Sequence, residues 1–222
     1  RSTNASHSTT RSFRFGNEHC RGTGFGDVQW EDGVLSRFFG DAVHAAYVVP
    51  DIKAAMQAWL DLGCGPIYLM DHVNPDARYR GVRNNPCISA AILNSGSMQI
   101  ELLQPHDDTP SAYTEFLARM PQGGLHHLAY WVDDFAAVIA RAAQEGVMLD
   151  VVQEFVDPQG APFEIYVERA GQSNPVLAQL MLKGPVEALY VGVRDAAQGW
   201  DGTAPIRNAL DLLGDTLDLH PE

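Results

Sequence analysis

The chain has 222 residues, of which 45% are hydrophobic, 19% charged and 9% aromatic, and its formal net charge is −13 at pH 7. This length fits one domain, or two small modules that share a core. The acidic balance argues against general nucleic-acid binding, because a phosphate backbone needs a basic surface, but it leaves open a small anionic ligand held by local arginines.

Residues 1–40 precede any periodic pattern, and we expect them to form a poorly ordered tail. The opening "RSTNASHSTTRSFRFGNEHC" lacks the apolar core of a secretory signal. No run approaches the roughly 20 apolar residues that span a bilayer, so we expect no membrane association. Cys20, Cys64 and Cys87 share no metal-type spacing, which favours a reduced, cytoplasmic protein.

The chain contains an internal repeat. "HAAYVVPDIKAAMQAWLDLG" begins at His44 and "HLAYWVDDFAAVIARAAQEG" at His127; at this offset of 83 positions (127 − 44) seven of the twenty residues are identical. Chance would give roughly one or two identities at ordinary residue frequencies. We therefore interpret the chain as a structural duplication.

Each copy predicts the same series of elements. A short apolar strand leads to an Asp at the N-cap position, an amphipathic helix and a terminating glycine. These are 44–49, Asp51, 52–62 and Gly63 in the first copy, and 127–132, Asp134, 135–145 and Gly146 in the second. Three strand-like segments follow: 66–71, 88–94 and 97–103 in the first copy, and 147–153, 162–168 and 175–181 in the second. The predicted order is therefore βαβββ, twice.

Two further segments complete the predicted organisation. Between the copies, "DDTPSAYTEFLARMPQGG" predicts a helix that is capped near Thr109 and has Pro110 at its first position. Residues 185–222 contain helical stretches broken by glycine and proline. We expect this helical extension to pack against the core or a partner subunit.

Polar residues inside otherwise apolar strands occupy matching positions in the two copies. His44 and His127 head the first strands, and alignment of "MQIELL" with "VLAQLM" places Glu101 opposite Gln179 in the last strands. If a pseudo-twofold relates the copies, the four side chains can converge on one point. Two imidazoles, a carboxylate and an amide oxygen suit one divalent metal ion, namely Zn, Ni, Co, Mn or Fe(II).

These motifs, "VHAAYVVPD", "MQIELLQP" and "LHHLAYWVDD", resemble the vicinal oxygen chelate superfamily, whose best-known isomerases are glyoxalase I and methylmalonyl-CoA epimerase. The likeness covers about residues 41–184 and is most similar to the epimerase-like branch. It implies an α+β fold in which two tandem βαβββ modules, 41–105 and 124–184, form an open barrel with N- and C-terminal extensions.

The resemblance also implies a metal-dependent isomerase, epimerase or lyase, which removes a proton next to the metal-polarised carbonyl of an acyl-CoA or small acid. One His and one Glu or Gln from each module hold the metal in this superfamily; the matching residues are His44, Glu101, His127 and Gln179. Glu101 is the carboxylate among them and the first candidate for the catalytic base. The family's epimerases and glyoxalases usually have Glu where this chain has Gln179. The expected partner is a small molecule, and the expected assembly is a homodimer.

Two other functions remain open from the sequence, because fold does not fix chemistry. One is a metal-free binding protein of the antibiotic-sequestering type. The other is an Fe(II) ring-cleaving dioxygenase, whose triad of two histidines and one carboxylate would be His44, His127 and Glu101.

Three polar residues of the second copy have more than one interpretation. Glu164 and Glu168 share one strand face, and either could be a second base, the intended carboxylate ligand in another register, or part of a solvated face. His126 has no mate in the first copy, where Val43 stands. Strand alternation predicts that it points away from His127, as a structural or outer-shell residue.

The last candidates lie in loops near the predicted pocket. "DARYRGVRNN" holds Arg78, Arg80 and Arg83, which we predict either to clamp the carboxylate or phosphates of a substrate or to form a solvated loop. His106 follows the Glu101 strand and is predicted at the pocket mouth as a substrate-binding residue.

Overall fold

The computed structural model describes residues 37–171 and 176–213, so the predicted tail lies almost wholly outside the described residues. The helices are α1 (Ile52–Asp61), α2 (Ala112–Arg119), α3 (Phe135–Gln144), α4 (Pro185–Ala197) and α5 (Leu210–Leu213). The strands are β1 (Ala42–Val48), β2 (Ile67–Val73), β3 (Ala77–Tyr79), β4 (Val82–Asn84), β5 (Ile88–Ser95), β6 (Met98–Pro105), β7 (Gly124–Val132), β8 (Leu149–Val156), β9 (Pro162–Arg169), β10 (Leu177–Leu182) and β11 (Ile206–Asn208).

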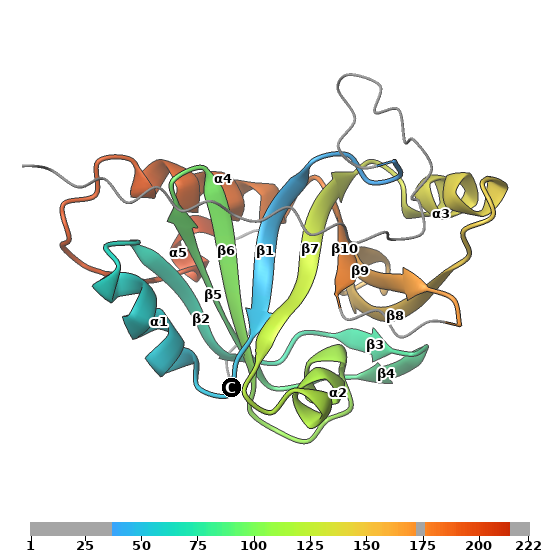
Figure 1. Ribbon diagram of the computed structural model, residues 1–222, viewed down its shortest axis with the longest axis horizontal. Coiled ribbons are helices and arrows are strands. Elements are labelled where there is room, and N and C mark those ends of the chain that lie inside the picture. Colours follow the sequence, from blue (N-terminus) through green and yellow to red (C-terminus); the bar gives the residue numbers. More distant parts are fainter. Residues whose placement is uncertain (1–36, 172–175, 214–222) are drawn as a thin grey trace, which may run out of the picture. The chain divides into compact units, whose positions relative to one another are not determined.

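The described strands form one mixed, open sheet in the order β11-β2-β5-β6-β1-β7-β10-β9-β8-β3-β4. The first copy supplies β2-β5-β6-β1 and the second supplies β7-β10-β9-β8. Equivalent strands therefore follow in the same order outward from the central antiparallel pair, β1 and β7 (Figure 1). In each half the first strand runs parallel to the last, β1 to β6 and β7 to β10. The predicted α+β fold with two tandem modules is confirmed, while the domain limits at 41 and 184 stay a prediction.

The helix caps follow the sequence signals. The side chain of Asp51 accepts a hydrogen bond from the backbone N–H of Ala54, and Asp134 does the same for Ala137. These bonds satisfy donors that an uncapped helix would leave free. The linker helix α2 corrects the prediction: Ser111, not Thr109, is its N-cap and forms a capping box with Thr114. The Ser111 hydroxyl accepts a hydrogen bond from the N–H of Thr114, and in a helix that began at Pro110 Ser111 would lie inside the first turn and could not be the N-cap.

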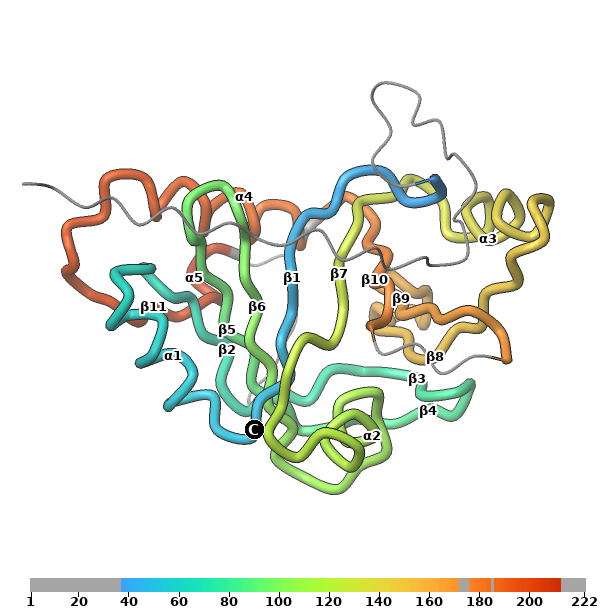
Figure 2. Tube along the Cα trace, viewed as in Figure 1, coloured from blue at the N-terminus to red at the C-terminus, as the bar shows by residue number. Residues whose placement is uncertain are grey.

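Three short strands were missed by the sequence patterns. The segment interpreted as an arginine loop folds into the hairpin β3–β4, which leaves the first half and pairs with β8 of the second (Figure 2). Strand β11 of the C-terminal extension pairs with the edge strand β2. Strands of three residues carry too little period-2 pattern to be recognised.

The helices cover the two faces of the sheet differently. On one face α1 packs through Ile52 and Met56 on the first half, and α3 packs through Val138 on the second. On the opposite face, which carries the repeat histidines, α2 and α4 pack in two separate clusters. The C-terminal extension therefore packs against the core, as expected, through α4. Among the described residues, no helix has the length and apolar character needed to cross a bilayer.

Candidate metal centre

Three of the four predicted ligands meet on the face covered by α2 and α4. Strand β1 lies between β6 and β7, and its Ala46 is paired with Glu101 on one side and His127 on the other. His44 is two residues before Ala46 and shares its face. The small side chain of Ala46 leaves the space in which the three polar side chains converge.

The three ligand atoms form a nearly equilateral triangle. His44 Nε2 lies 3.3 Å from Glu101 Oε2, His127 Nε2 lies 3.4 Å from the same oxygen, and the two Nε2 atoms are 3.4 Å apart. A point about 2 Å from all three atoms exists, which matches the bond lengths of Zn²⁺ to imidazole and carboxylate. The residues present therefore fit a divalent metal ion.

Buried polar atoms without partners support this fit. Glu101 Oε2 is buried and forms no hydrogen bond within the described residues, although two imidazoles stand close to it. Buried polar atoms normally have a partner, because an unsatisfied one costs about 1–3 kcal/mol. A cation between these three atoms would satisfy them together.

Gln179 lies in the position that the repeat predicts. Glu101 pairs with the residue two after His44, and Gln179 pairs with Ala129, two after His127, so the register of the last strands is the same in both halves. The Gln179 amide nitrogen donates to Glu164 Oε2 at 3.0 Å and to the Tyr166 hydroxyl at 3.2 Å. Its amide oxygen is buried without a partner, so it is available as a fourth ligand.

His126 corrects the expectation from strand alternation. In the β1–β7 ladder Ala46 pairs with His127 but Tyr47 pairs with Leu125, so His126 is the extra residue of a β-bulge. A bulge places two successive side chains on one side of a strand. His126 therefore lies beside His127, buried against α2, instead of on the opposite face.

The bulge creates a chain of hydrogen bonds behind His127. Nδ1 of His126 is 2.9 Å from Nδ1 of His127, and its Nε2 is 3.3 Å from the carbonyl oxygen of Ala112. One tautomer satisfies both contacts: His126 Nε2–H donates to Ala112, and His127 Nδ1–H donates to His126. This leaves Nε2 of His127 unprotonated toward Glu101 and His44, as metal binding requires.

The pKa values agree with these roles. Burial and the neighbouring His127 lower the pKa of His126 to about 3, so the ring is neutral. Burial also lowers the pKa of His127. Burial alone would raise the pKa of Glu101. In the metal-free protein, His127 and His44 with Nε2–H groups facing the carboxylate outweigh burial and lower that pKa to about 2; a bound cation would replace these protons. The centre thus holds one carboxylate and a neutral His127 near pH 7.

Glu164 is a second buried carboxyl, and it lies beside Gln179 in the same centre as Glu101. Burial and the nearby charge of Glu101 raise its pKa to about 8. Glu168 shares its strand but forms an ion pair with Arg80, with 3.4 Å between Oε1 and Nη1. Of the two, only Glu164 lines the cavity described next.

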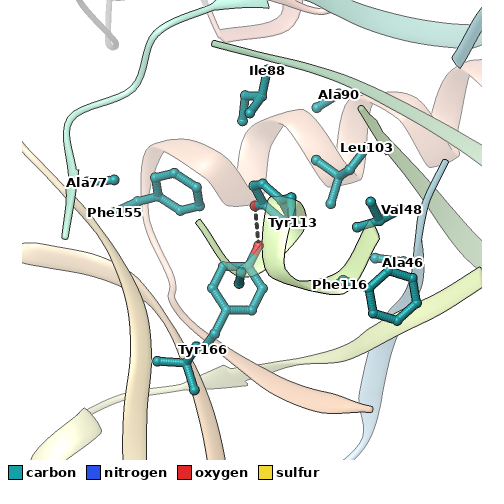
Figure 3. Close-up of a cluster of buried hydrophobic side chains, with 12 residues drawn as sticks. Ala46, Val48, Ala77, Ile88, Ala90, Leu103, Tyr113, Phe116, Phe155 and Tyr166 are labelled. Atoms are coloured by element: carbon teal, nitrogen blue, oxygen red, sulfur yellow. Dashed lines mark hydrogen bonds between the residues drawn. The ribbon is translucent and has the colours of Figure 1, made fainter. Parts of the chain in front are cut away.

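A cavity of about 350 Å³ opens over the centre on this face. Its walls come from both halves of the sheet and from α2 and α4, and they include Glu101, Glu164 and Gln179. Figure 3 shows the neighbouring apolar cluster, in which the hydroxyl groups of Tyr113 and Tyr166 are joined by a hydrogen bond of 2.8 Å. Sequence reasoning missed both tyrosines, because neither has a mate in the repeat.

The predicted substrate-binding residues do not line this cavity. Arg78, Arg80 and Arg83 form ion pairs with Glu154, Glu115 and Asp76 respectively. His106 stacks on His72, with 3.8 Å between the ring centroids, and contacts the Ser89 hydroxyl at 2.7 Å. A substrate role for these four residues stays a prediction that this geometry does not support.

Asp71, His72 and His106 form a second group of metal-type ligands, near the surface. The β2–β5 ladder shifts between Met70 and Val73, which leaves Asp71 and His72 unpaired, and His72 has a φ of 53°. The Ser89 hydroxyl lies 2.7 Å from Asp71 Oδ1, so this group already has hydrogen-bond partners.

A family model described as the glyoxalase/bleomycin resistance protein/dioxygenase superfamily matches residues 43–165. The methylmalonyl-CoA epimerase of Mycobacterium tuberculosis is 21% identical, with a TM-score of 0.48, and the match covers 70% of this chain and 96% of that one. The Streptomyces coelicolor methylmalonyl-CoA epimerase, solved with 2-nitronate-propionyl-CoA, is 19% identical over 65% of this chain and 97% of its own, with a TM-score of 0.44. A hypothetical protein of Bacillus halodurans C-125 is 20% identical, with a TM-score of 0.46 and coverage of 65% and 94%. No curated sequence matches the chain significantly.

Proposed function

Because the chain belongs to the glyoxalase/bleomycin resistance protein/dioxygenase superfamily, the vicinal oxygen chelate proteins, we propose that it is a metal-dependent isomerase, epimerase or lyase. The reaction would move a proton next to the carbonyl of an acyl-CoA or a small acid. The observation that carries the proposal is the buried triangle of His44, Glu101 and His127, with its unpartnered carboxylate oxygen.

The proposed centre combines one cation site with two carboxyls in opposite protonation states. His44, Glu101 and His127 would hold the ion, with the amide oxygen of Gln179 as a fourth ligand. A divalent ion supplies Lewis-acid polarisation of the substrate's carbonyl when bound. Glu101 is ionised and able to accept a proton, whereas Glu164 is protonated below about pH 8 and able to donate one. Such a divergence of two pKa values is typical of paired acid and base groups.

The two carboxyls also come from different parts of the sheet. Glu101 belongs to β6 of the first half and Glu164 to β9 of the second, and both line one cavity. An epimerase needs proton-transfer groups on both sides of the reacting carbon. We propose Glu101 and Glu164 for these two roles.

Metal analysis and solvent exchange test the proposal. We expect purified protein to contain about one divalent ion per chain and to catalyse deuterium incorporation from D₂O into methylmalonyl-CoA or a hemithioacetal. The Glu101→Gln variant, which keeps the shape of the side chain, serves as the matched control and should lose exchange. Protein that binds no metal and exchanges no such substrate would refute the proposal.

An Fe(II) ring-cleaving dioxygenase is the second candidate, because two histidines and one carboxylate on one face also form the triad of such enzymes. Oxygen uptake with a catechol by the Fe(II)-loaded protein would favour it. The metal-free binding protein is the weaker alternative, since it leaves the unpartnered atoms unexplained. Full ligand binding after His44→Ala and His127→Ala substitution would support it. The homodimer and the cytoplasmic location stay predictions.

A further inference from the structure

We infer that the substrate is a compact carbonyl compound with an apolar body and no phosphate group, and is not a coenzyme A ester. This inference rests on the proposed function, and it chooses between the two substrate classes named there. It comes from the chemistry of the cavity wall and of the cavity mouth.

Between the polar groups of its deep end and the polar residues of its mouth, the wall of the cavity is mainly apolar. Glu101, Glu164 and Gln179 are buried at the metal end. The apolar side chains of the wall are Met70, Val73, Ile88, Ala90, Leu103, Phe155, Val156, Phe163, Val186 and Leu189. Burial of apolar surface stabilises a bound ligand by about 25 cal/mol per Å², so this wall favours an alkyl or aryl body.

Helix α4 supplies a polar group at the deep end as well. The ring of Tyr190 stacks on His44, with 5.1 Å between the centroids and 16° between the planes. Its backbone carbonyl accepts a hydrogen bond of 3.0 Å from the Gln99 amide, which fixes the helix here. The Tyr190 hydroxyl forms no hydrogen bond within the described residues, and Tyr190 lines the cavity together with Glu101 and Glu164. The hydroxyl is therefore available to a substrate oxygen, while an apolar body would lie toward Phe155 and Phe163.

The mouth of the cavity lacks the groups that recognise phosphate. Asn74, Asn85 and Pro158 are its exposed residues, and Asp76 and Asp157 lie beside them. Among the described residues, no lysine or arginine lines the cavity. Phosphate groups are normally held by Arg, Lys or backbone N–H groups at a helix N-terminus.

Two arginines of the β3–β4 hairpin, Arg78 and Arg83, are already paired with carboxylates. Arg83 lies 3.1 Å from Asp76 Oδ1, and Arg78 lies 3.3 Å from Glu154 while it also donates to the Gly160 carbonyl. The first turn of α4 carries Glu187. A coenzyme A ester would have to place its phosphates near these acidic groups, on a chain with a net charge of −13.

Equilibrium binding to the metal-loaded protein tests the inference. Isothermal titration would compare acetoacetyl-CoA with the N-acetylcysteamine thioester of acetoacetate, which has the same acyl group without the nucleotide and its phosphates. The third probe is the benzoylacetyl thioester of N-acetylcysteamine, which adds an aryl body. We expect the benzoylacetyl ester to bind at least about tenfold more tightly than acetoacetyl-CoA, with the acetoacetyl ester between them.

Charge variants at the mouth supply the matched control. Asp157→Asn keeps the acceptor that holds the N–H groups of Gln159 and Ala161 but removes the charge. It should tighten acetoacetyl-CoA binding about threefold at low salt, whereas the exposed Asp150→Asn should not.

Either of two results would overturn the inference: acetoacetyl-CoA binding as tightly as the aryl ester, or no binding of any probe. Deuterium exchange judges the proposed function separately. If the aryl ester binds tightly but no substrate undergoes catalysed exchange, this inference is supported and the proposed isomerase function is refuted.

Discussion

The described part of the chain holds two groups of metal-type ligands, and only one of these two has the properties of a metal centre. In the buried group, His44, Glu101 and His127 point their ligand atoms at one another across 3.3–3.4 Å. In the surface group, His72 and His106 lie face to face, 16° from parallel. Imidazole binds a metal in the plane of its ring, so two stacked rings cannot both aim at one ion without rotating.

The two groups also differ in how their polar atoms are satisfied. Glu101 Oε2 is buried without a hydrogen bond, whereas Asp71 Oδ1 accepts one from Ser89 and contacts His72 Nδ1 at 2.8 Å. Ligand types alone therefore do not identify a site. Convergent lone pairs and unsatisfied buried atoms do, because they leave a cost that a cation would remove.

The strongest test of this difference removes a buried ligand. His127→Ala should lower the affinity for a divalent metal by more than about 100-fold, since loss of an outer partner alone typically costs 10–100-fold. Metal content by mass spectrometry and competition with a chelator measure the effect. Wild-type metal content in this variant would place the ion elsewhere.

The pH dependence of stability tests whether the buried carboxyl of Glu164, next to this centre, destabilises the fold when it loses its proton. The pKa of Glu164 rises from 4.5 to about 8 on folding, through burial and the charge of Glu101. Because the folded value is the higher one, its contribution to stability is complete below pH 4.5 and declines as the pH rises through 8. The free energy of unfolding of metal-free protein should fall by about 2 kcal/mol between pH 6 and pH 8 through this group.

Urea denaturation at the two pH values measures this change. Glu164→Gln should remove most of the decline, while Glu154→Gln, at a half-buried position outside the cavity, should keep it. An equal slope in wild type and Glu164→Gln would show that Glu164 does not retain its proton.

A milder substitution removes the support behind His127. His126→Phe keeps a ring against Tyr113 and Phe116 but offers no acceptor to His127 Nδ1–H. Metal affinity should fall by about 10–100-fold, and His126→Gln, which still carries an acceptor, should recover part of it. Unchanged affinity in His126→Phe would mean that the bulge serves packing alone.

The smallest effect is expected at the surface group. His106→Gln should leave metal stoichiometry and affinity at wild-type values, because this group lacks convergent ligand atoms. Titration with Zn²⁺ measures both quantities. Loss of one bound equivalent in this variant would erase the distinction between the two groups.

The repeat explains why so much of the buried centre could be predicted. His44 and His127 stand in matched positions of a duplicated pattern, and the register that aligned Glu101 with Gln179 is the one the sheet uses. A single polar residue in an apolar strand is weak evidence for a ligand, but the same feature at matching positions of both copies is stronger evidence. The same comparison failed for His126, because the extra residue of a bulge has no counterpart in the other copy. The bulge also places the His126 side chain on the same side of the strand as His127, whereas alternation predicts the opposite side.

The parts that the sequence did not predict lack local periodicity. Tyr113, Tyr166 and Tyr190 come from three distant elements, and they line one cavity because α2 and α4 fold onto one face. The arginines of the β3–β4 hairpin have intramolecular partners as distant as Glu154 and Glu168, which no local pattern encodes. Pairing over such distances is decided by tertiary packing.

The β3–β4 hairpin also makes the two halves structurally dependent on each other. Its strand β3 belongs to the first half but pairs with β8, joining Tyr79 to Gln153. The edge strand of the second half is therefore covered by a strand of the first half, and this pairing closes a long loop of chain, which costs conformational entropy. We therefore expect the duplicated unit to unfold as one cooperative structure instead of two independent copies, because residues of both halves also line the cavity.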